Sequence, residues 1–90
     1  MKTVTLWGNM FDAAVRVATK YRAENGKDRP YLTEGGFILI WPTGIVEVTG
    51  WAARLDSRML FDRGTLAVDM NDNVYVLCGN GWEQAEKAQD

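Results

Sequence analysis

Histidine is absent from this 90-residue sequence, and cysteine and serine occur once each, as Cys78 and Ser57. The absence of histidine removes the usual general base near neutral pH, together with Ser-His-Asp triads and most catalytic metal sites. A single cysteine excludes an internal disulfide and a zinc site built on paired cysteines. We therefore expect a protein that is not an enzyme and that holds no cofactor and no metal.

Long apolar runs and a strong net charge are missing as well. No apolar run approaches the ~18 residues of a membrane span, so we expect no membrane contact. Ten basic and 12 acidic residues give a net charge of −2, and 47% of the residues are hydrophobic. This balance is typical of a soluble globular protein with one modest core. The sequence predicts a single domain over residues 1–90, in the cytoplasm.

Residues 10–24 carry the clearest periodic pattern. Apolar residues recur there at steps of three and four, which is typical of an amphipathic helix with one buried face. The members of this face are Phe11, Ala14, Val15, Ala18 and Tyr21. Asn9 is expected to cap the start of this helix, and Asn25-Gly26 to end it in a left-handed conformation.

Short β-branched and aromatic segments predict strands at residues 3–7, 36–41, 45–49, 65–68 and 74–77. The turn sequences at residues 42–44 and 69–73 predict two hairpins. Residues 50–63 are compatible with either a helix or a strand, and residues 82–88 are expected to form a short C-terminal helix. The predicted fold is α+β, with one amphipathic helix packed on an antiparallel sheet of four or five strands built from two hairpins.

The turn at residues 69–73 resembles the opening of an EF-hand calcium loop, with Asp69, Asn71 and Asn73 at alternate positions. Such a loop requires glycine at its sixth position and glutamate at its twelfth, where this chain has Val74 and Asn80. The sequence therefore predicts a hairpin turn without bound calcium.

Four tryptophans are many for a core of this size, and tryptophan often anchors protein interfaces. We assign Trp7 and Trp41 to the core, and Trp51 and Trp82 to an exposed interface. From residue 69 onward, five acids oppose one lysine, a net charge of −4, which suits a partner with a basic groove. The predicted partner-binding residues are Trp51, Trp82, Asp69, Asp72, Glu83 and Glu86.

Half of the basic residues gather between residues 16 and 29, which supports an alternative function in nucleic-acid binding. This alternative requires the bases on one continuous exposed face, with an aromatic side chain beside them. Its residues are Arg16, Lys20, Arg22, Lys27, Arg29 and Tyr31. A further alternative is a small-ligand or enzymatic domain that uses the carboxylates of its loops.

In size, mild acidity and element order, the whole chain resembles the small α+β proteins that phages encode to inhibit host machinery, anti-CRISPR proteins among them. The resemblance implies a stoichiometric inhibitor that blocks a nucleic-acid site on an effector complex in the host cytoplasm. Together with the missing catalytic residues, it predicts a non-enzymatic protein-binding module that occupies a protein or ribonucleoprotein partner.

Overall fold

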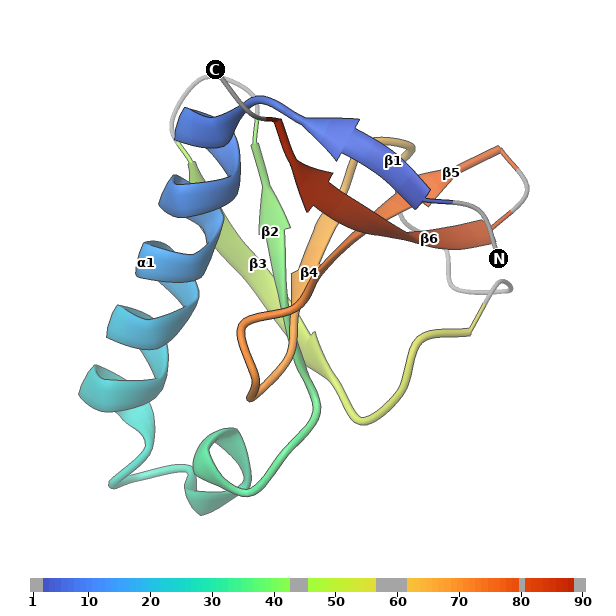
Figure 1. Cartoon of the computed structure of the whole chain (residues 1–90). Helices are drawn as coiled ribbons and strands as arrows, with labels where there is room; N and C mark the ends of the chain where they lie inside the picture. Colours follow the sequence, from blue (N-terminus) through green and yellow to red (C-terminus); the bar gives the residue numbers. More distant parts are fainter. Residues whose placement is uncertain (1–2, 43–45, 57–61, 80, 89–90) are drawn as a thin grey trace.

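The computed structural model describes residues 3–42, 46–56, 62–79 and 81–88. Within them, one helix, α1 (Gly8–Asn25), lies against a six-stranded sheet, and a short 3-10 helix, η1 (Pro30–Thr33), follows it (Figure 1). The strands are β1 (Thr3–Leu6), β2 (Phe37–Trp41), β3 (Glu47–Ala52), β4 (Leu66–Val68), β5 (Val74–Cys78) and β6 (Gly81–Lys87). The α+β prediction is confirmed, with six strands where four or five were expected.

The sheet has the strand order β1-β6-β5-β4-β2-β3. The predicted pairs β2–β3 and β4–β5 are antiparallel, as expected for hairpins, and β2–β4 and β5–β6 are antiparallel too. β1 and β6 are parallel neighbours, so the sheet is mixed and not purely antiparallel. Part of the predicted turn at residues 42–44 lies outside the described residues.

The predicted C-terminal helix is wrong, because residues 81–87 form strand β6. This strand lies between β5 and β1, so its backbone is hydrogen-bonded on both sides. The pairing outweighs the helix propensity of its glutamate, glutamine, alanine and lysine residues. The segment 50–63, left open between helix and strand, begins as the end of β3, and its residues 57–61 lie outside the described part.

The main core lies between α1 and the sheet. Ala14 and Ala18 are fully buried there, and their small side chains let the helix approach the strands closely. Phe11, Val15 and Tyr21 pack around them, which confirms the predicted helix face. A second, smaller cluster on the opposite face of the sheet comprises Leu39, Ala52 and Ala67 with Phe37, Leu55, Tyr75 and Trp82.

Both ends of α1 differ from the prediction. The helix begins at Gly8, so that Trp7 occupies the capping position and Asn9 lies inside the first turn. Gly26 has φ −64°, which is right-handed, so the expected left-handed stop is wrong. Glycine is required there by close packing, because a Cβ would lie 2.4 Å from Cγ2 of Thr33 and 2.6 Å from the carbonyl oxygen of Arg22.

Candidate protein-binding surface

Among the large hydrophobic residues that the structure describes, Trp7 is the most exposed, at 78%. Its assignment to the core is therefore wrong. Val4 and Leu6 of β1 pack toward the helix and the core, whereas Thr3 and Thr5 are exposed on the alternate positions. Trp7 has the parity of the two threonines, and the chain turns into α1 directly after it. This parity is a signal in the sequence that could have placed Trp7 at the surface.

Among the strands that the structure describes, β1 forms one edge of the sheet and pairs with β6 alone (Figure 1). The N–H of Ala88 donates to the carbonyl oxygen of Leu6 at 2.7 Å, so the peptide groups of Leu6 point toward β6. Since successive residues of a strand direct their peptide groups to opposite sides, those of Thr3 and Thr5 point to the free edge. β1 carries no charged residue. It is therefore an edge that another strand can pair with.

The other edge of the sheet, β3, differs in several respects. It carries Glu47, and its pairing with β2 shifts register between Leu39 and Ile40, which marks a bulge. The hydroxyl of Thr49 donates to the carbonyl oxygen of Leu39 at 3.3 Å. Charges and bulges on an edge oppose the addition of a further strand. The two edges are thus unequal, and β1 is the one without such features.

An ion pair holds the end of β6 beside the first turns of α1. The Nζ of Lys87 lies 2.8 Å from Oδ2 of Asp12, with both side chains half exposed. Gly8 lies beneath it, since a Cβ at Gly8 would be 3.3 Å from Cε of Lys87. These contacts fix the backbone on the C-terminal side of Trp7, so the exposed indole is attached to an ordered junction.

The two tryptophans predicted as partner anchors are half-buried and contribute to the fold. The indole N–H of Trp51 donates to the carbonyl oxygen of Gly35 at 3.2 Å, and its ring packs edge-on against Tyr31 with centroids 4.7 Å apart. The indole N–H of Trp82 donates to the carbonyl oxygen of Asp56 at 3.3 Å. Neither indole is presented to solvent as Trp7 is.

The four acids of the predicted set do not form one surface. Asp69 closes the β4–β5 turn, because its carboxylate accepts hydrogen bonds from the N–H groups of Asn71 and Asn73 at 2.8 and 2.9 Å. Asp72 is exposed in the same turn and adopts the left-handed conformation, with φ 65°. Glu83 and Glu86 are three residues apart on β6 and therefore face opposite sides of the sheet.

Glu83 lies beside the single cysteine of the chain. Burial raises the pKa of the Cys78 thiol, and the neighbouring Glu83 carboxylate raises it further by hydrogen bonding and charge. The thiol therefore stays protonated near neutral pH, which is the unreactive form.

The basic residues of the nucleic-acid alternative are divided between surface and interior. Arg16, Lys20, Lys27 and Arg29 are exposed, and Tyr31 is 43% exposed. Arg22, by contrast, is 8% exposed, and its guanidinium donates hydrogen bonds to backbone carbonyls. The continuous face of five bases that this alternative requires is therefore missing one of its central members.

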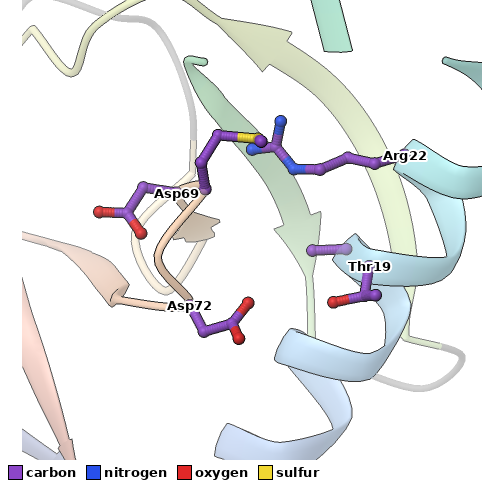
Figure 2. Close-up of a pocket in the computed structure, with 6 residues that line it drawn as sticks. Thr19, Arg22, Asp69 and Asp72 are labelled. Carbon is purple, nitrogen blue, oxygen red and sulfur yellow. The ribbon is translucent and has the colours of Figure 1, made fainter. Parts of the chain in front are cut away.

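A hollow of about 290 Å³ lies between α1 and the β4–β5 turn (Figure 2). Its lining includes Thr19, Arg22, Asp69 and Asp72. The Asp69 carboxylate points away from Arg22 in Figure 2. It accepts hydrogen bonds from the backbone N–H groups of the turn. Throughout the described ranges, no three histidine, cysteine, aspartate or glutamate side chains gather in a way that could hold a metal ion.

Comparisons of the chain with family models, with curated proteins and with solved structures each find no match. Among the described residues, no helix has the length and apolar character needed to cross a membrane.

Proposed function

We propose that this protein is a non-enzymatic protein-binding module that binds its partner along the free edge of β1, with Trp7 as the anchor. The observation that carries the proposal is the 78% exposure of Trp7 beside an uncharged edge strand. Tryptophan, tyrosine and arginine are enriched among the energetically dominant contacts of protein interfaces. The Lys87–Asp12 ion pair helps to hold the backbone that carries this indole, and a pre-ordered contact loses less conformational entropy on binding.

Strand addition suits this surface better than electrostatic docking. The acids predicted to meet a basic groove lie in the β4–β5 turn and on opposite faces of β6, so they offer such a groove no single acidic face. The outward peptide groups of Thr3 and Thr5 supply hydrogen bonds to any extended segment, independent of its sequence. That the partner belongs to a nucleic-acid-processing complex, and that binding inhibits it, stays a prediction from size, charge and element order.

A selection of randomised peptides displayed on ribosomes or phage tests the proposal. We expect the wild-type protein to enrich peptides with a β-prone segment, and Trp7→Ala to lose most of their affinity. Met70→Ala is the matched control, because Met70 is also exposed, at 44%, but lies in the remote β4–β5 turn. Peptides that bind wild type and Trp7→Ala equally would overturn the assignment of the surface.

Nucleic-acid binding is tested separately with a mixed DNA and RNA pool at low salt, where non-specific binding is strongest. We expect no retention of the pool. Retention that is lost in Lys20→Ala or Arg16→Ala, with no peptide enriched, would favour the nucleic-acid alternative.

A further inference from the structure

The free edge of β1 is complementary to itself. An interface around a two-fold axis requires that one surface meet an identical copy without opposing like charges. β1 has no charged residue, and the outward N–H and C=O groups of Thr5 are reciprocal, so two copies can exchange them across a two-fold axis at Thr5. A second copy of β1 therefore offers this edge matching hydrogen-bonding groups and no like charges.

We infer that the partner for this edge is a second copy of the chain, joined by antiparallel pairing of the two β1 strands about a two-fold axis at Thr5. The inference rests on the proposed function, since it names the occupant of the same surface. The two Thr5 residues then exchange N–H···O=C hydrogen bonds directly, and the sheets of both copies become continuous.

The register follows from the two faces of the sheet. A two-fold axis perpendicular to the sheet keeps each face continuous, so side chains of one face must oppose each other. With Thr5 at the axis, Val4 opposes Leu6 of the second copy on the helix side, and Thr3 opposes Trp7 on the other side. With the axis at Val4, Trp7 would instead lie opposite no residue of the second copy's described strand. The Thr5 register covers apolar side chains and shields the exposed indole.

The paired strands are short, so the interface belongs to the small class that exchanges readily. We expect concentration-dependent association, with an apparent mass that rises from 10.1 kDa toward twice that value. Sedimentation equilibrium between about 10 μM and about 1 mM covers the range in which such interfaces dissociate.

Two substitutions at Thr5 test the backbone pairing. Thr5→Pro removes the outward N–H, and proline is tolerated on an edge strand because that N–H makes no bond within the sheet. Thr5→Val keeps the N–H and the β-branched shape. We expect Thr5→Pro to raise the dissociation constant of the dimer at least about tenfold and Thr5→Val to leave it nearly unchanged. Circular dichroism checks that both variants keep the fold.

Cross-linking tests the register in a Cys78→Ala background, which removes the native thiol. Thr5→Cys places two thiols at the axis, and a short bifunctional thiol reagent should join them. Thr3→Cys is the matched control, because the two Thr3 residues would lie about 14 Å apart along the strands. Equal cross-linking of both variants would overturn the register.

The outcomes separate the inference from the proposed function. A chain that stays monomeric up to about 1 mM overturns the second copy as the partner. Peptide binding that depends on Trp7 would still stand in that case. A wild-type dimer that Thr5→Pro leaves intact also overturns the inference, since the copies would then meet through another surface.

Discussion

At the scale of single residues, Arg22 was predicted to lie at the surface, but it is buried and connects several parts of the fold. It is 8% exposed at the end of α1. Its guanidinium donates to four backbone carbonyls, those of Leu32, Gly35, Gly36 and Val68. Burial lowers the pKa of Arg22, while the carboxylates of Asp69 and Asp72 raise it. One planar, forked cation thus joins the helix to the segment before β2 and to β4.

Replacing this side chain should destabilise the whole protein. We expect Arg22→Met to lower the free energy of unfolding by about 3 kcal/mol or more, because buried carbonyls lose their donors. Arg16→Met, on the exposed side of α1, should stay within about 0.5 kcal/mol of wild type. Urea unfolding followed by tryptophan fluorescence measures both. Equal midpoints for the two variants would show that the carbonyls find water or other donors.

The position of Arg22 could have been predicted in part. Ala14, Ala18 and Arg22 are spaced by four residues, which places the arginine on the buried stripe of the helix. The other basic residues between residues 16 and 29 favoured an exposed position for Arg22 instead. The bonded carbonyls could not have been predicted, because Val68 lies 46 residues away and only the assembled sheet brings it to α1.

At the scale of elements, α1 packs on the sheet through alanines. Ala14 is 0% exposed and Ala18 is 1% exposed. Small side chains at these positions let the helix lie against the sheet, where it contacts β2, β3, β4 and β5. Larger residues such as Phe11 and Val15 lie at the margins of the contact, where they are only partly buried.

A larger side chain at the centre should force the two layers apart. We expect Ala14→Leu to destabilise the protein by about 1–3 kcal/mol, since an added isobutyl group has no space between helix and sheet. Ala23→Leu makes the same chemical change at an exposed position of α1 and should alter stability by less than about 0.5 kcal/mol. Thermal or urea unfolding distinguishes the two. No loss in Ala14→Leu would mean that the helix can shift outward at little cost.

The elements that the sequence predicts well are those with local contacts. The helix shows a clear period, and each confirmed hairpin joins strands that are close in the chain. β6 was assigned wrongly because its residues favour a helix and its strand character depends on partners on both sides. One of those partners is β1, where Thr3 lies opposite Gln84. A register across 81 residues (84 minus 3) leaves no local pattern in the sequence.

At the scale of the whole molecule, the first and last strands of the described chain lie side by side. β1 and β6 are parallel, and the Lys87–Asp12 ion pair lies where β6 meets the start of α1. The order of the sheet therefore places the N-terminal strand at one edge, with Trp7 at its end. The pairing of β1 with β6 therefore also creates the edge strand on which the proposed function depends.

Amide hydrogen exchange along β1 should reveal both roles of this strand. In dilute protein, the amides of Val4 and Leu6 should exchange slowly because they point toward β6, while that of Thr5 should exchange quickly at the free edge. Raising the protein concentration should slow the Thr5 amide as the second copy pairs with it. The amides of β3 form the control, since that edge should exchange at a rate independent of concentration. A Thr5 rate that never changes with concentration would contradict pairing of two copies, and fast exchange at Val4 and Leu6 would contradict the parallel pairing of β1 with β6.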